Sequence, residues 1–89
     1  MDKTVIKLVK DYVINHLDKS DEIPEFEVFT VWKCKILQNW KYLVSTTLPD
    51  GMYYEVTYDG DMKRAYLDVY KKWANVVIPD STVVLDNVD

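Results

Sequence analysis

Residues that could do chemistry are few in this chain of 89 residues. Its only thiol is Cys34 and its only imidazole is His16, and no cluster of histidines or cysteines has metal-ligand spacing. A nucleophilic thiol needs a base and partial exposure, whereas Cys34 alternates with Trp32 and Ile36, which predicts burial in the core. His16 lies near the end of a helical pattern, where a cation suits the helix dipole. Neither residue indicates catalysis.

Carboxylates are the second group of residues that could bind a ligand or take part in catalysis. Asp59 and Asp61, with Glu55 nearby, could hold a hard cation or act as an acid and base pair. The pattern of a calcium-binding loop is absent from the sequence, and a turn and a helix cap account for both aspartates. The 2 glycines are too far apart to form a phosphate-binding loop. We therefore expect no enzymatic activity, no cofactor and no bound metal.

The charge balance, the N-terminal residues and the chain length limit the expected partners, location and number of domains. The 15 Asp and Glu outnumber the 11 Lys and Arg, and the net charge of −4 disfavours nucleic acid as a partner. Charges at Lys3, Lys7 and Lys10 interrupt the apolar runs near the N-terminus, so we expect neither a signal sequence nor a membrane span. A single cysteine fits a reducing, cytoplasmic compartment. The length predicts one domain over residues 1–79, followed by an acidic tail at 80–89 that is loose or docked as a short strand.

Hydropathy periods predict the elements that carry these residues. Apolar residues recur at steps of three and four from Thr4 to Leu17, which predicts an amphipathic helix ending near residues 18–20. Alternation then predicts three strands, over residues 25–37, from the turn at 38–39 to residue 48, and over 52–58. Pro49-Asp50-Gly51 predicts the second turn. In the first strand the residues expected to face the core are Phe26, Val28, Thr30, Trp32, Cys34 and Ile36.

Residues 62–77 allow two interpretations. The pair Asp59-Gly60 could close a hairpin and lead into a fourth strand. However, alternation breaks at Lys71, and Tyr66, Val69, Tyr70, Trp73 and Val77 lie on one helical face. This spacing favours a second helix. The predicted fold is therefore an α+β two-layer sandwich in αβββα order, with a three-stranded antiparallel meander and both helices on one face.

The central segment resembles a known family. The run WKCKILQNWKYLVSTTLPDGMYYEVTYDGD, from Trp32 to Asp61, and the run from Tyr66 to Trp73 are similar to small uncharacterised proteins encoded by phages and prophages of Gram-positive bacteria. The resemblance covers about half of the chain and includes both turns. It implies a phage accessory protein in a bacterial cytoplasm, a domain of unknown function with no catalytic or binding residues to carry over.

Side chains that alternate away from the predicted core indicate a binding surface. The expected contact residues are Phe29, Val31, Lys33, Lys35, Lys41, Leu43 and Tyr53. Exposed apolar groups often mark interfaces, although scattered ones are also ordinary on a solvated sheet. The leading hypothesis is a non-enzymatic protein that binds a host or phage protein, or a second copy of itself, through this sheet face or a strand edge.

Two other binding hypotheses stand beside it. The αβββα order is also that of the double-stranded RNA-binding fold, in which Lys63 and Arg64 would open the last helix and meet phosphates. The flanking aspartates and the net negative charge count against this alternative. A further option is mimicry of nucleic-acid charge by a cluster of acids, which more often forms a solvated linker: Asp18, Asp21, Glu22, Glu25 and Glu27.

Overall fold

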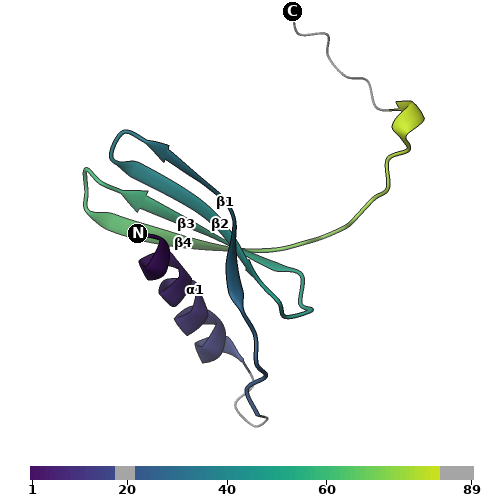
Figure 1. Cartoon of the computed structure of the whole chain (residues 1–89), viewed down its shortest axis with the longest axis horizontal. Helices are drawn as coiled ribbons and strands as arrows, with labels where there is room; N and C mark the ends of the chain where they lie inside the picture. Colours follow the sequence, from purple (N-terminus) through teal and green to yellow (C-terminus); the bar gives the residue numbers. More distant parts are fainter. Residues whose placement is uncertain (18–21, 83–89) are drawn as a thin grey trace, which may run out of the picture.

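The computed structural model describes residues 1–17 and 22–82. Its elements are α1 (Asp2–His16), β1 (Val28–Ile36), β2 (Asn39–Thr46), β3 (Met52–Asp59), β4 (Arg64–Lys71) and a 3₁₀ turn, η1 (Asp80–Thr82). The four strands form one antiparallel sheet in the order β1-β2-β3-β4. Helix α1 lies against one face of this sheet, and the chain after β4 runs away from it (Figure 1).

The helix is the cover of the sheet, as its period predicts. Val5, Val9 and Val13 recur every four residues on one side of α1 and are buried. They pack on four buried side chains of the two central strands, namely Tyr42, Val44, Tyr54 and Val56. These seven residues are the core. The predicted end of the helix near residues 18–20 lies outside the described residues.

Contacts at the start of α1 attach it to the sheet. The Tyr42 hydroxyl donates a hydrogen bond to Asp2 Oδ1, and Lys33 Nζ lies 3.0 Å from Asp2 Oδ2. Burial raises the pKa of Tyr42 to about 12, and the hydrogen bond to the Asp2 carboxylate acts in the same direction. The bonds from Tyr42 and Lys33 lower the pKa of Asp2. The helix N-terminus is thereby fixed over β1 and β2.

The predicted second helix over residues 62–77 is wrong. Residues Arg64–Lys71 form β4, which pairs with β3 from Met52↔Lys71 to Asp59↔Arg64. Asp59 Oδ1 accepts hydrogen bonds from the backbone N–H of Asp61 and Met62, at 3.0 and 3.1 Å, so the Asp-Gly pair starts a hairpin turn. The three-stranded αβββα sandwich with two helices is therefore corrected to one helix and four strands.

The residues that suggested one helical face do not form one surface in the structure. Tyr66 and Tyr70 lie opposite Thr57 and Tyr53 in the sheet, whereas Trp73 lies beyond its end. Aromatic and β-branched residues suit a pleated strand, and pairing with β3 satisfies the backbone groups that a helix would have satisfied internally.

A β-bulge in β1 changes which residues face the helix. Thr30 lies opposite Val44, Trp32 lies opposite Leu43, and Val31 is the extra residue between them. One extra residue reverses the alternation for the rest of a strand. Val28 and Thr30 keep their predicted side, but Cys34 and its neighbours do not. The residues turned to the opposite face are Trp32, Cys34 and Ile36, all exposed.

The last segment of the described chain is a C-terminal arm, defined here as residues 73–82. The N–H of Lys72 donates to the Gly51 carbonyl at 2.7 Å, and beyond this bond the chain leaves the sheet in an extended form (Figure 1). The Trp73 side chain is 99% exposed. The expected boundary at residue 79 therefore falls inside the arm, and residues 83–89 of the predicted tail lie outside the described residues.

Candidate protein-binding surface

The face of the sheet opposite α1, called the outer face below, carries the site. Residues opposite each other in an antiparallel sheet point to the same side. The outer-face side chains therefore form three rows across the four strands, followed by the pairs Ile36–Asn39 and Asp59–Arg64 at the end of the two hairpins: Phe29, Ser45, Tyr53 and Tyr70; Trp32, Leu43, Glu55 and Asp68; Cys34, Lys41, Thr57 and Tyr66. No described helix or strand packs on them.

Four aromatic side chains are exposed on the outer face. Phe29, Trp32, Tyr66 and Tyr70 are between 44% and 51% exposed. They belong to the two edge strands and surround the partly buried Leu43. Patches of exposed apolar groups on a folded domain often mark a contact surface, whereas single exposed residues do not. The outer face thus resembles the inner face of a sheet sandwich with its second layer removed.

The charges on the outer face are unequal. Lys41 Nζ lies 3.3 Å from Glu55 Oε1, and Glu55 lies directly opposite Asp68 on β4. Of these two neighbouring carboxylates, Glu55 has an ion pair among the described residues and Asp68 has none. A partner that brings a cation to this row would complement the face.

One end of the outer face is hollowed. A cavity of about 400 Å³ is lined by Trp32, Cys34, Ile36, Asn39, Trp40, Lys41 and Thr57. Its apolar walls include Trp32 and Ile36 of β1, whereas the ring of Trp40 lies on the helix side, stacked on Tyr42. A space of this volume and lining can take one large apolar side chain.

The two turns beside the cavity are joined to each other. Gln38 Nε2 donates a hydrogen bond to Asp61 Oδ1, and the Gly60 N–H donates to Asn39 Oδ1 at 3.0 Å. A Cβ atom at Gly60 would collide with the Gln38 carbonyl, so the backbones approach closely. These links hold the cavity end of the sheet in a fixed shape. Asp61 therefore serves the turn contact and not the predicted helix cap.

Four of the seven predicted contact residues lie on the outer face, namely Phe29, Lys41, Leu43 and Tyr53. Val31 is the exposed bulge residue. The remaining two are on the helix side, because the bulge shifts them: Lys33 bonds Asp2, and the Lys35 ammonium lies 5.0 Å from the centre of the Trp40 ring. The exposed outer-face residues that sequence reasoning missed are Trp32, Cys34, Ile36, Tyr66 and Tyr70.

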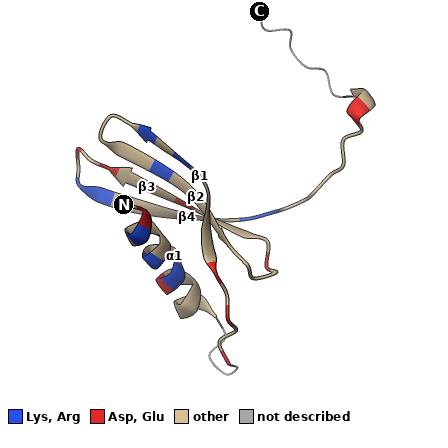
Figure 2. Ribbon diagram, viewed as in Figure 1, with Lys and Arg blue, Asp and Glu red and all other residues tan. Residues whose placement is uncertain are grey.

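The residues of the nucleic-acid alternative do not open a helix. Lys63 lies in the β3–β4 turn with φ 52°, and Arg64 begins β4 opposite Asp59. The comparison with the double-stranded RNA-binding fold therefore loses its basis, which was the second helix. Figure 2 shows acidic and basic residues interspersed along α1 and the sheet, without a continuous basic stripe in the part of the chain that is described.

Candidate catalytic and metal-binding residues are dispersed. Cys34 is exposed on the outer face, so the predicted burial is wrong. His16 stacks on Tyr12 at the far end of α1, and its Nδ1 lies 2.8 Å from the Tyr12 carbonyl. Within residues 1–17 and 22–82, no group of three or more histidines, cysteines or acids is arranged to hold a metal. The prediction that the chain is not an enzyme stays a prediction.

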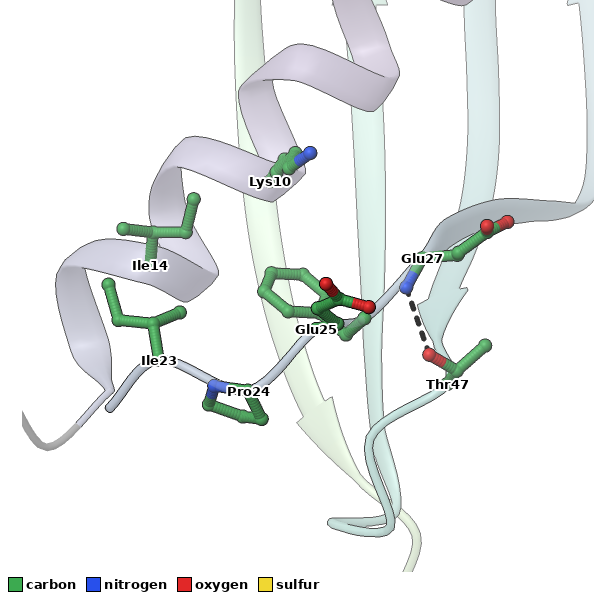
Figure 3. Close-up of a pocket in the computed structure, with 8 residues that line it drawn as sticks. Lys10, Ile14, Ile23, Pro24, Glu25, Glu27 and Thr47 are labelled. Carbon is green, nitrogen blue, oxygen red and sulfur yellow. Dashed lines mark hydrogen bonds between the residues drawn. The ribbon is translucent and has the colours of Figure 1, made fainter. Parts of the chain in front are cut away.

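A second cavity, of about 500 Å³, lies between α1 and the segment that leads into β1 (Figure 3). Its lining residues are Lys10, Ile14, Ile23, Pro24, Glu25, Phe26, Glu27 and Thr47. The Glu27 N–H donates to Thr47 Oγ1 at 2.9 Å, and the Thr47 N–H donates to the Glu27 carbonyl at 3.0 Å. Charges of both signs line this cavity, which makes it a weaker apolar site than the outer face. Of the acidic cluster, Glu25 and Glu27 line this cavity, Glu22 is exposed, and Asp18 and Asp21 lie outside the described residues.

Comparison with known proteins gives a family and nothing more specific. Residues 2–80 match the model of a family of unknown function, DUF6275. No curated protein matches the chain, and no solved structure does. No helix in the described ranges is long and apolar enough to cross a membrane. The expected resemblance to an uncharacterised family is confirmed in this form, and its phage setting stays a prediction.

Proposed function

The chain belongs to the DUF6275 family, and we propose that it is a protein-binding domain whose contact surface is the outer face. One observation carries the proposal: α1 covers only one side of a sheet that has aromatic residues on both sides. The uncovered aromatic residues Phe29, Trp32, Tyr66 and Tyr70 are 44% to 51% exposed. Tryptophan and tyrosine are the side chains that most often supply binding energy in protein interfaces.

The setting follows from the sequence resemblance. We propose a phage accessory protein that acts in the cytoplasm of a bacterial host, where it binds a phage or host protein. The run from Trp32 to Asp61 supports this, and it includes much of the outer face. Rigid strands and joined turns favour such a role, because a surface already held in shape loses little conformational freedom on binding.

Matched substitutions test the proposal. Immobilised wild-type chain is compared with Tyr70→Ser, on the outer face, and with Leu8→Ser, an exposed apolar residue of α1. Proteins offered are a bacterial extract and a differently tagged copy of the chain. We expect wild type and Leu8→Ser to retain the same proteins, and Tyr70→Ser to lose at least one of them while its melting temperature stays within a few degrees. Identical retention by all three chains, or unfolding of Tyr70→Ser, contradicts the proposal.

A further inference from the structure

We infer that the partner of the outer face is a second copy of this chain, whose C-terminal arm packs on the face and places Trp73 in the cavity beside Cys34. This inference rests on the proposed function and names its partner. The exchange is reciprocal: each copy supplies an arm and receives one, as a two-fold axis requires.

The arm is apolar enough that we expect it to pack against another protein surface. Six consecutive residues, Trp73 to Ile78, carry no charge. Trp73 is 99% exposed and Val77 is 86% exposed, so the arm presents large apolar groups to water. An extended apolar segment beside an uncovered apolar face provides the two halves of one contact.

The cavity is out of reach of the arm that belongs to the same copy. On β4 the row of the cavity is at Tyr66, five residues before Lys71, and the cavity lies toward β1 and β2. Strand geometry places it about 17 Å back along the strand and about 10 Å across. The chain from Lys71 to Trp73 spans at most about 7 Å. A tryptophan so close to the end of β4 therefore reaches the cavity of another molecule, not its own.

The direction of the strands fits reciprocal exchange. The arm leaves the sheet at the end opposite the β1–β2 and β3–β4 turns (Figure 1). A two-fold axis that lies across the strands sets two outer faces together with strands running in opposite directions, so the arm end of each copy meets the cavity end of the other. Only the distance of about 10 Å from β4 toward β2 then remains for the chain and the indole side chain of Trp73 to cover together.

Charge and area support the same partner. Lys71 and Lys72 are exposed at the base of the arm, while Glu55 and Asp68 lie side by side on the outer face and only Glu55 of the two has an ion pair among the described residues, with Lys41. Four strands of about eight residues make a face of about 19 by 26 Å, or about 500 Å². A stable interface needs about 800 Å² from each partner. The arm adds a strip about 20 Å long to what each copy contributes, which brings the contact near that size.

Solution mass and thiol labelling test the inference together, because Cys34 lines the cavity and reports its occupancy. At high concentration we expect wild type to have twice the mass of the chain and Cys34 to react at least about tenfold more slowly than after dilution, since labelling follows the open population. Trp73→Ala should be monomeric, fold normally and label quickly at every concentration. Asn75→Ala, a control in the same arm, should behave as wild type.

The other outcomes overturn the inference. A monomeric wild type removes it, and a monomer with protected Cys34 means that the arm folds back on its own sheet. A dimer that survives Trp73→Ala with unprotected Cys34 uses another surface. In each case the proposed function is judged separately by Tyr70→Ser: if that variant still loses a retained protein, the outer face binds a different partner.

Discussion

The two faces of the sheet are built from alternate residues of the same strands, yet they end in different environments. On the helix side, Tyr42, Val44, Tyr54 and Val56 are at most 3% exposed, whereas the outer-face aromatics of the two edge strands are about half exposed. Both faces carry aromatic residues, so composition does not separate them. The difference is the cover that α1 provides. Folding uses one face of this sheet, and the second is available for a partner.

The largest expected effect separates the faces by stability. Val56→Ser should lower the free energy of unfolding by about 3 kcal/mol, because it leaves a gap under α1 and buries a hydroxyl. Phe29→Ser, on the outer face, should change it by less than about 1 kcal/mol when both chains are measured at concentrations at which they are monomeric. Urea denaturation followed by circular dichroism measures both. Equal losses would mean that the outer face also belongs to the core.

The next effect concerns the end of the sheet that holds the cavity. Gly60→Ala should destabilise the domain by about 1 to 3 kcal/mol, because its Cβ would push against the Gln38 carbonyl and separate the two turns. Gly51→Ala is the comparison at the other end, where a Cβ meets only Lys72 Cβ at 3.7 Å and the cost comes from the positive φ of 69°. If only Gly60→Ala also weakens binding on the outer face, the joined turns shape that surface.

A smaller effect tests how α1 is attached. Tyr42→Phe removes the hydrogen bond to Asp2 and should cost about 1 kcal/mol at neutral pH. In the folded wild type the pKa of Tyr42 is about 12, above the ordinary 10.0, so the hydroxyl contributes stability below pH 10.0 that is lost as the pH rises toward 12. Denaturation at several pH values should show this alkaline loss in wild type and a reduced one in Tyr42→Phe.

The dependence of stability on pH that comes from Asp2 has the opposite sign to that from Tyr42. The pKa of Asp2 is lowered from 3.8, so its contribution is present above pH 3.8 and is lost as the pH falls below that value. Asp2→Asn should remove this acid dependence. A curve for Asp2→Asn that parallels wild type below pH 3.8 would show that other carboxylates dominate there.

The elements with a clear hydropathy period or turn sequence were predicted correctly. The valines of α1 and the turn at Pro49-Asp50-Gly51 were predicted from spacing and turn chemistry alone, and β2 and β3 follow them. Hydropathy argues against the bulge at Val31, because regular alternation would place Lys33 and Lys35 away from α1 and the more apolar residues of β1 toward it. A bulge is decided by pairing with β2, which a single strand does not encode.

The same reasoning explains the contact residues. Phe29, Leu43 and Tyr53 were predicted because they lie before the bulge or on regular strands. Tyr66 and Tyr70 were missed because four-residue spacing suits a helix face as well as alternate positions of a strand. In that region long-range pairing with β3, and not local preference, decides the structure.

The smallest expected effect tests the bulge itself through one side chain. Burial would make Cys34→Ser costly, but an outward, exposed Cys34 predicts a loss of stability below about 0.5 kcal/mol.

The rate of thiol labelling compares the two faces with the same chemistry. One chain is Trp73→Ala, which keeps the native Cys34 and in which the arm cannot cover it. The other chain carries a second thiol, as Val44→Cys together with Cys34→Ser. The first should react quickly with a thiol reagent in the folded protein. The second, facing α1, should react only as the protein unfolds. Slow reaction of Cys34 in the monomeric variant would return Trp32, Cys34 and Ile36 to the helix side and remove the cavity from the outer face.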